Sequence, residues 1–258
     1  MTLKDHSTLQ ATTATPPITA VKASLFTLVI FVENQARKAF FDSLVDTIMP
    51  YFPCRVIAII AGKESPLNCE HTTKTVRLGK KAILCDIFTI TSSYSELAQV
   101  PFTLLPLLRP DLPIHLLWAE DLSATPAIFS ELKKISSRLI FDSMATPDLF
   151  EFARSFINRE NTFPDHIIDL TWARLSGWRH IMAETFNSAQ KIDQLKNTHK
   201  IDLVYNDRTT DHFTHPEYTS FQFIAWLASQ LNWTFQSKTD KIMVFKRKNK
   251  EIKPRFRQ

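Results

Sequence analysis

The chain has 258 residues, of which 44% are hydrophobic and 22% are charged, so it has enough apolar material for a packed core and does not resemble a disordered protein. Glycine occurs only 3 times, whereas a chain of this size ordinarily contains about 18. Gly62, Gly79 and Gly177 are too far apart to form a glycine-rich phosphate loop or the glycine-flanked serine of a nucleophile elbow. The composition therefore excludes the common nucleotide-binding and hydrolase motifs.

The formal net charge of +5 is concentrated near the C-terminus. From Lys246 onward there are seven basic residues and one acidic residue, a local charge of +6, which leaves −1 for the rest of the chain. We expect residues 248–258 to form a solvated basic tail. RNA binding through this tail is an alternative hypothesis.

The cysteines Cys54, Cys69 and Cys85 are few and odd in number, which argues against a disulfide scaffold and favours reduced thiols in the cytoplasm. Their redox sensitivity stays open, and without a C-x-x-C pair we expect no metal site. The first 22 residues are rich in Thr, Ser and Ala, which predicts a flexible leader and not a signal peptide. The longest apolar run, Leu25 to Val32, is much shorter than the ~20 residues of a membrane span.

Strands and helices alternate in the first half of the sequence. Two β-branched apolar runs enclose a segment with helical spacing, which predicts a βαβ unit. Ser93 and Glu96 form a capping-box pattern that predicts the start of a further helix. The expected elements are strands at 25–32 and 55–60 around a helix at 35–51, a hairpin of strands at 72–77 and 82–90, a helix from 93 to about 109, a strand at 113–118, a helix at 126–134 and a strand at 138–141.

The second half is predicted to be mainly helical at first and then α/β. A helix is expected at 147–157 and a strand at 201–205. Thr214 and Glu217 predict the start of another helix, whose apolar stripe precedes a hairpin of strands at 234–235 and 242–245.

The predicted fold class is α/β, with a mixed sheet and βαβ units in an N-terminal lobe, a helical connection and a smaller α/β C-terminal lobe. The predicted boundaries are a flexible leader at 1–22, the N-terminal lobe at 23–145, the helical connection at 146–190, the C-terminal lobe at 191–247 and the basic tail at 248–258.

Carboxylates that follow predicted strands are candidates for chemistry, because active sites of α/β sheets lie at strand ends. They are Asp86, Asp111, Glu120, Asp121, Asp142 and Asp169. A hydrolase would combine Ser143 with His180 or His115, but no spacing supports this pair. Since strand-end carboxylates more often cap loops, we predict no catalytic, cofactor-binding or metal-binding residue.

Residues 168–186 contain two tryptophans and two arginines. Drawn as one helix, the segment presents a single apolar face that also carries Arg179; the apolar residues of this face are Leu175, Trp178, Met182 and Phe186. A guanidinium on such a face needs an acceptor, so we expect Arg179 to pair with Asp169 or Asp142 inside the fold, or to face a partner. We expect Trp172 and Trp178 in the core, although Trp and Arg are also preferred interface anchors.

At these residues the sequence resembles the glucose-6-phosphate dehydrogenase assembly protein family, usually called OpcA. The segment IIDLTWARLSGWRHIMAETFN at 167–187 is similar to the family signature Asp-Leu-x-Trp-x-Arg-Leu-x-x-Trp-Arg, and LLPLLRPDLPIHLLWAEDL at 104–122 is similar to a second family segment. Weaker similarities follow the expected order at 53–60, 136–143 and 223–233. Departures are Ala119 and Gly177, where the family often has Trp and Pro, and His180, where it often has an acidic residue.

The resemblance implies a non-catalytic assembly factor, or allosteric effector, that binds glucose-6-phosphate dehydrogenase, promotes its active oligomer and supports the oxidative pentose phosphate pathway. NADP would belong to the partner enzyme, and neither a membrane nor a nucleic acid is an expected partner. The candidate residues, either at the interface or structural members of the signature, are Trp118, Asp142, Asp169, Trp172, Arg174, Trp178 and Arg179.

Two further expectations remain. Gly177 at the family's proline position suggests that the helix begins at about 176–178, after an ordered approach from Asp169 to Leu175. An α/β enzyme acting on a sugar phosphate is an alternative function; its phosphate would be recruited by the basic residues of the first hairpin, which are Lys74, Arg77, Lys80 and Lys81.

Overall fold

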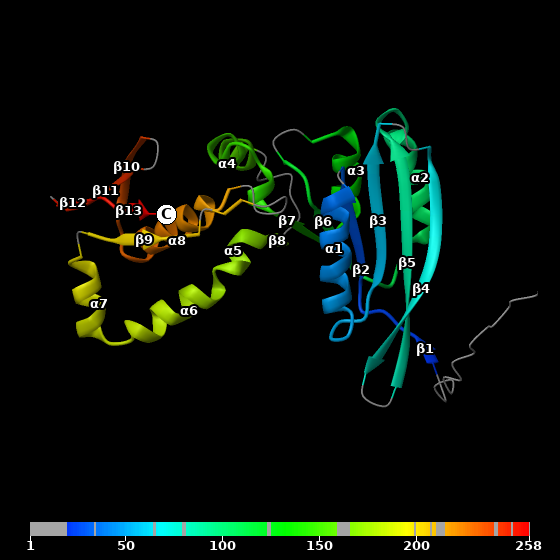
Figure 1. Cartoon of the computed structure of the whole chain (residues 1–258), viewed down its shortest axis with the longest axis horizontal. Coiled ribbons are helices and arrows are strands. Elements are labelled where there is room, and N and C mark those ends of the chain that lie inside the picture. Colours follow the sequence, from blue (N-terminus) through cyan, green and yellow to red (C-terminus); the bar gives the residue numbers. More distant parts are fainter. Residues whose placement is uncertain are drawn as a thin grey trace, which may run out of the picture.

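The computed structural model describes residues 20–33, 35–63, 66–78, 81–122, 125–158, 166–198, 200–206, 208–209, 215–239, 242–248 and 250–257. Within these ranges, eight strands form one large sheet (Figure 1). They are β1 (Ala20–Lys22), β2 (Thr27–Val32), β3 (Arg55–Gly62), β4 (Asn68–Leu78), β5 (Lys81–Ser93), β6 (Ile114–Trp118), β7 (Arg138–Phe141) and β8 (His166–Asp169). The sheet order is β1-β5-β3-β2-β6-β7-β8, with β4 paired to β5.

The sheet is doubly wound about its central strand. β2 pairs in parallel with β3 on one side and with β6 on the other. The chain therefore moves outward from β2 to β3 and β5, returns to β6, and continues outward to β7 and β8. β4 is antiparallel to β5, which makes the sheet mixed. The predicted α/β class with βαβ units is confirmed, and the reversal between β2 and β6 is the topological switch point of such sheets.

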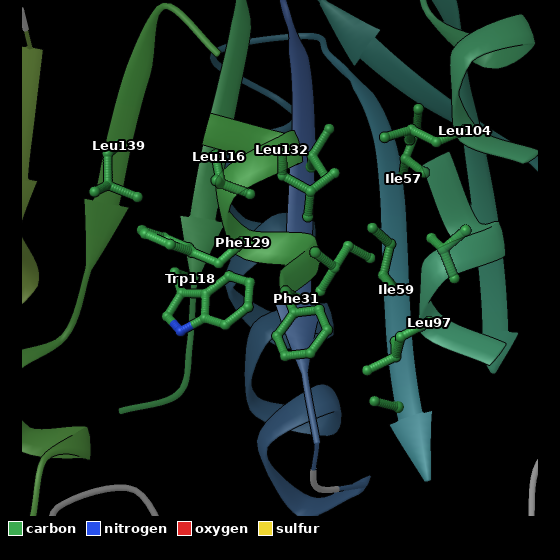
Figure 2. Close-up of a cluster of buried hydrophobic side chains, with 14 of the residues drawn as sticks. Phe31, Ile57, Ile59, Leu97, Leu104, Leu116, Trp118, Phe129, Leu132 and Leu139 are labelled. Atoms are coloured by element: carbon green, nitrogen blue, oxygen red, sulfur yellow. The ribbon is translucent and has the colours of Figure 1, made fainter. Parts of the chain in front are cut away.

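Helices cover both faces of the sheet, because successive strand residues point to opposite sides and both sides of β2 are apolar. The elements are α1 (Gln35–Ile48), the 3-10 turn η1 (Tyr94–Gln99), α2 (Val100–Leu104), the 3-10 turn η2 (Leu105–Leu107), α3 (Ala127–Ile135), the 3-10 turn η3 (Ser143–Ala145) and α4 (Leu149–Asn158). Figure 2 shows one face, where Phe31 and Ile57 of the sheet belong to one cluster with Leu104 of α2 and Phe129 of α3. On the other face, Phe40, Phe41, Leu44 and Val45 of α1 pack on alternate residues of the same strands.

The C-terminal part has a core of its own around one helix. Its elements are α5 (Leu170–Arg174), α6 (Ser176–Thr185), α7 (Ala189–Lys196), β9 (Asp202–Val204), α8 (Glu217–Gln230), β10 (Thr234–Thr239), β11 (Ile242–Arg247), β12 (Lys250–Ile252) and β13 (Arg255–Arg257). β10, β11 and β12 form an antiparallel sheet, and β13 pairs in parallel with β9. The predicted stripe of α8 is buried and packs with Trp233, Phe245 and Ile252.

The expected helix from residue 93 to about 109 is wrong in detail. It consists of two 3-10 turns around the short α2, because Pro101 and Pro106 lack the N–H groups that a continuous helix requires. Ser93 does not cap the backbone; its hydroxyl donates to Glu96 Oε2 at 3.0 Å. Thr214 lies outside the described residues, so its predicted capping role is not described.

Some strands of the described ranges appear where the sequence predicted none. β1 lies within the predicted leader, and β8 within the predicted helical connection. The prediction that residues 248–258 form a solvated tail is wrong, because strands β12 and β13 lie in this segment. From Glu251 to Arg257, exposed charged residues alternate with Ile252, Pro254 and Phe256, and the side chains of Ile252 and Phe256 pack on the C-terminal core. The high net charge concealed this two-residue period.

Candidate protein-interaction surface

The two strands at one end of the large sheet bring two predicted carboxylates together. Phe141 of β7 is the register partner of Asp169 of β8, so Asp142 lies just beyond the end of β7, close to the end of β8. Around them lies a group of polar side chains, which we call the polar junction. Its members are Asp142, Ser143, Asp169, Thr171, Arg174 and Gln222.

Asp142 accepts hydrogen bonds at both carboxylate oxygens. Arg174 donates from Nη1 to Oδ1 at 3.0 Å and from Nη2 to Oδ2 at 2.8 Å. Thr171 Oγ1 donates to Oδ1 at 2.9 Å, and the Met144 amide donates to the same oxygen at 3.2 Å. Asp142 is buried, and the bidentate ion pair with Arg174 offsets the free-energy cost of removing its carboxylate from water.

Asp169 caps helix α5 and also contacts the C-terminal part. Its Oδ1 accepts from the Thr171 amide at 3.0 Å and from the Ser143 amide at 3.1 Å. Gln222 of α8 donates from Nε2 to Asp169 Oδ2 at 2.8 Å and to Ser143 Oγ at 2.9 Å. Burial raises the pKa of Asp169 above its ordinary value, although these hydrogen bonds oppose the shift. The junction therefore joins β7, β8, α5 and α8.

Two short helices follow the polar junction and carry the rest of the tryptophan-arginine segment. α5 ends at Arg174 and α6 begins at Ser176, and Leu175, with a ψ of −4°, lies between them as the cap of both helices. Leu175 itself is buried, which holds this corner against the protein. The start of α6 at Ser176 confirms the expected start near 176–178, and the approach from Asp169 is itself one helical turn. A Cβ atom at Gly177 would meet nothing within 4 Å, so this position tolerates larger residues.

Arg179 interacts with Trp172 and not with the predicted carboxylates. Its Nη1 donates to the Trp172 carbonyl at 2.7 Å, and its Cζ lies 3.7 Å from the centre of the Trp172 ring. The prediction that Arg179 pairs with Asp169 or Asp142 is wrong, because Arg174 occupies that position on the preceding helix. Arg174 and Arg179 are five residues apart, so at about 100° per residue they point in clearly different directions even on one continuous helix. Spacing did not show which of the two arginines meets the carboxylates.

The tryptophans of this segment are exposed, in contrast to the expectation that they are core residues. The exposed fraction is 39% for Trp172 and 62% for Trp178. Ile181, one helical turn after Trp178, is 52% exposed. We call Trp172, Trp178, Arg179 and Ile181 the α5–α6 surface. Trp and Arg are the residue types that dominate binding energy at protein interfaces.

Trp118 is a core residue and lies apart from this surface. It is fully buried, with its ring 4.1 Å from that of Phe31 in a parallel stack and 4.8 Å from that of Phe129 in an edge contact (Figure 2). Of the sequence-predicted residues, the structure thus brings Asp142, Asp169 and Arg174 together inside the fold. Sequence reasoning missed Thr171 and Gln222, because no motif marks the polar residues of α5 and α8 that reach this junction.

The catalytic combination of Ser143 with a histidine is not assembled. Ser143 Oγ is bonded to Gln222, His180 pairs with Glu184 on α6 at 3.1 Å, and His115 stacks on Phe26. Of the other carboxylates that follow predicted strands, Asp86 lies within β5, forms ion pairs with Lys22 and Arg55, and is hydrogen-bonded to His71 Nε2 at 3.0 Å. Glu120 accepts the Glu33 amide at 2.9 Å.

The basic residues proposed to recruit a phosphate are only partly described. Lys74 forms an ion pair with Asp46 of α1, and Arg77 is exposed. Lys80 and the side chain of Lys81 lie outside the described residues. The described part of this cluster therefore gives no support to a phosphate site.

Comparison with known proteins identifies two matching domain models, both described as parts of a glucose-6-phosphate dehydrogenase subunit. Residues 45–156 match its N-terminal domain, and residues 165–255 match its C-terminal domain. Together the two matches span most of the chain. The boundary between them lies between α4 and β8.

Two curated relatives carry a name of the same family. The chain is 24% identical over 202 residues to a protein of Synechocystis sp. and 24% identical over 198 residues to one of Nostoc punctiforme. These matches cover 75% and 74% of this chain but only 40% of each relative, and both relatives carry the name OpcA, which links them to the OxPP cycle.

The chain was also aligned with a solved structure of an α,α-trehalose-phosphate synthase from Burkholderia xenovorans. The alignment covers 90% of this chain and 49% of the synthase, at 8% sequence identity. The TM-score of 0.26 is too low to indicate a shared fold. Within the described ranges, none of the helices has the length and apolarity needed to cross a membrane. The two domain models and the curated relatives agree, and the chain belongs to the OpcA family of glucose-6-phosphate dehydrogenase assembly proteins.

Proposed function

We propose that this chain is a non-catalytic assembly factor that binds glucose-6-phosphate dehydrogenase and promotes its active oligomer through the α5–α6 surface. The matched domain descriptions name this enzyme, and the curated relatives carry a name linked to the OxPP cycle. NADP and glucose 6-phosphate then bind to the partner enzyme, and the complex acts in the cytoplasm. The chain itself supplies a surface and no reacting group.

The observation that carries this proposal is the division of the signature segment into a buried half and an exposed half. Asp169, Arg174 and Leu175 have complete roles inside the fold, as a helix cap, an ion-pair partner and a core residue. Trp178 has no comparable role, since 62% of its surface is exposed. A large aromatic side chain on a supported helix favours a role in binding a partner.

Local support makes this surface suited to binding. Arg179 holds Trp172 through a ring contact and a backbone hydrogen bond, so both side chains are ordered before a partner arrives. The polar junction fixes the start of α5, and Leu175 fixes the corner before α6. Side chains that are already ordered lose less conformational entropy on binding.

Promotion of an active oligomer requires unequal affinities. An effector shifts its partner toward the active state only by binding that state more tightly than the inactive state. The α5–α6 surface would therefore contact a region of the dehydrogenase that differs between the two states. This requirement distinguishes an assembly factor from a protein that merely adheres to the enzyme.

The test combines purified dehydrogenase from the same organism with the wild-type chain, W178A or I181A, and measures oligomer size and enzyme kinetics in the same samples. The wild-type chain is expected to increase both the active oligomer and the activity. Each variant is expected to bind about tenfold or more weakly, because a central tryptophan or its neighbour contributes more than about 1.4 kcal/mol to an interface. F102A is the matched control, since Phe102 of α2 is 76% exposed and lies away from the signature segment.

Two results would overturn the proposal. One is the absence of a complex and of any kinetic change with the wild-type chain, under reducing and oxidising conditions alike. The other is unchanged activation by W178A together with lost activation by F102A, which would move the interface to the α2 side of the large sheet. Circular dichroism of each variant establishes that the chain remains folded.

A further inference from the structure

β4 is a long strand with one open edge. It pairs with β5 in an antiparallel register that continues without a shift from Asn68, opposite Thr91, to Leu78, opposite Lys81. β1 and β3 occupy the other side of β5, and among the described residues β4 has no second neighbour. Figure 1 shows β4 as the outermost strand, on the right of the sheet. Its outward N–H and C=O groups are available for pairing with another strand.

Two common protections of an edge strand are missing from β4. Many edge strands are short, or are interrupted by a proline or a bulge, whereas the charged side chains that also protect edges are present here as Glu70, Lys74 and Arg77. β4 has 11 residues, and its sequence NCEHTTKTVRL contains no proline. The opposite edge of the sheet is formed by β8, which has only 4 residues. Among the residues that the structure describes, the two ends of the sheet therefore differ in length, and only the β4 end has a long regular edge.

We propose that β4 pairs with β4 of a second copy of this chain, so that two sheets join edge to edge in a two-fold symmetric dimer. Antiparallel pairing by a two-fold axis centres the register on one residue, which lies opposite its own copy. Centring on Thr72 places Glu70 opposite Lys74 of the partner subunit, and symmetry forms this pair twice. Opposite charges directly across two strands stabilise their pairing.

The charges select this register over its neighbours. Centring on Glu70 or on Lys74 would place like charges opposite each other, which destabilises a strand pair. Centring on His71 or Thr73 would leave Glu70 and Lys74 opposite uncharged residues. Because β4 is polar and mostly exposed on both faces, apolar burial specifies its register only weakly, and the charge pairs decide it.

A second copy of the chain fits this edge better than an unrelated strand. Glu70 and Lys74 lie at equal distances on either side of Thr72, which is the arrangement that self-pairing requires. Both are even-numbered residues of β4 and so face the side of the sheet that α1 covers, where Lys74 already forms an ion pair with Asp46. Lys74 is thus oriented on the same face as the Glu70 side chain that would approach from the partner subunit.

The test uses the full chain alone in sedimentation velocity over a concentration series, with the single variants E70K and K74E. Each variant places like charges opposite each other in its own dimer, so its dissociation constant is expected to rise about tenfold or more. An equimolar mixture of the two variants is expected to dimerise again, because every pair across the mixed interface then has opposite charges. Added salt should weaken wild-type pairing.

Two controls separate pairing from folding. E131K makes the same change of charge at an exposed site on α3, and D46N removes the intrachain partner of Lys74; both are expected to dimerise as the wild type does. A wild-type chain that stays monomeric at every concentration overturns the proposal. Dimerisation of E70K that equals the wild type, or a mixture that associates no more than its components, also overturns it. No dehydrogenase is present, so this result is independent of the proposed function.

Discussion

The guanidinium of Arg174 donates to both carboxylate oxygens of Asp142, at 3.0 Å and 2.8 Å, and thereby ties helix α5 to the end of strand β7. The two residues are 32 positions apart in the sequence, so this ion pair fixes a tertiary contact and not a local one. It also explains why one arginine of the signature segment is structural. The other, Arg179, orders an exposed tryptophan.

R174A is expected to destabilise the protein by about 2–3 kcal/mol, because it leaves the buried Asp142 carboxylate without its cation. R174K should recover only part of this loss, since an ammonium group does not reproduce the two parallel hydrogen bonds. Urea unfolding followed by circular dichroism measures both variants. R154A is the matched control: Arg154 is an exposed residue 3.9 Å from Glu151, and its loss should change the stability by less than about 0.5 kcal/mol. Equal losses for R174A and R154A would contradict the structural role.

R179A is expected to cost only about 0.5–1 kcal/mol in stability, because the contact with Trp172 is partly exposed. The near-ultraviolet circular dichroism of Trp172 should nevertheless change, since the ring loses its stacked partner. W172A serves as the reference for that spectral contribution. A loss in stability above about 3 kcal/mol would instead place Arg179 among the residues that hold the core together.

D86N is expected to destabilise the protein at neutral pH by about 2–3 kcal/mol, because Arg55 is buried beside this carboxylate at 2.6 Å. Burial alone would raise the pKa of Asp86, but hydrogen bonds from Lys22 and His71 and the charges of Lys22 and Arg55 outweigh it, so the pKa is lowered. The ordinary pKa of an aspartate side chain, which applies in the unfolded state, is 3.8. Between this value and the lowered pKa of the folded state, the folded state binds fewer protons than the unfolded state. The advantage of the wild type over D86N should shrink as the pH falls through this window. A difference that is constant with pH would contradict the ion pairs.

Asp169 should show the opposite pH dependence. Burial raises its pKa, so the folded state holds the proton longer than the unfolded state does. Its contribution to stability is therefore full below pH 3.8 and is lost as the pH rises through the raised pKa of the folded state. D169N, which keeps a side-chain oxygen for the cap of α5, should remove this loss. Chemical denaturation of the wild type and D169N between pH 3 and pH 7 measures how the free energy of unfolding of each protein changes with pH.

Cys69 is expected to be the fast-reacting thiol of the folded protein. Cys54 and Cys85 are buried, and burial, with a smaller contribution from the nearby Cys85, raises the pKa of Cys54 to about 12. Because the thiolate is the reactive form, maleimide labelling at pH 8 should modify one of the 3 cysteines before unfolding and all of them in denaturant. C69S should abolish the fast phase. Equal labelling rates for Cys54 and Cys69 would show that the β3–β5 region opens readily.

I252A is expected to destabilise the C-terminal core by about 2–4 kcal/mol, because Ile252 is 2% exposed and packs within the cluster around α8. K253A, at the next position, removes only an exposed charge and should have little effect. Thermal unfolding of the two variants measures the difference. Similar melting temperatures would restore the interpretation of this segment as a solvated tail.

The central strands of the sheet were predictable from sequence because they are buried on both faces. β2 and β3 are continuous apolar runs, so no knowledge of their neighbours is needed to recognise them. β8 and β12 are short and have only two and one apolar residues, so their formation depends on the hydrogen bonds that an existing strand edge offers. Such elements depend on tertiary contacts that a local pattern does not contain.

The candidate site was predictable in composition but not in arrangement. The signature residues were recognised, yet the roles of Arg174 and Arg179 depend on their tertiary partners, because Arg174 reaches Asp142 at the end of β7 whereas Arg179 contacts Trp172. The exposure of Trp178 was missed for a related reason. A tryptophan is assigned to the core by default, and only the three-dimensional structure shows that α6 leaves it uncovered.

The position of β8 has a consequence for how this protein can be divided. The match to the C-terminal domain begins at residue 165, but β8 completes the sheet of the preceding domain through its pairing with β7. Gln222 then bonds α8 to both Ser143 and Asp169. A chimaera that exchanges the two halves at this boundary would transplant a strand out of its own sheet, so recombination at residues 159–165 should produce two incomplete proteins.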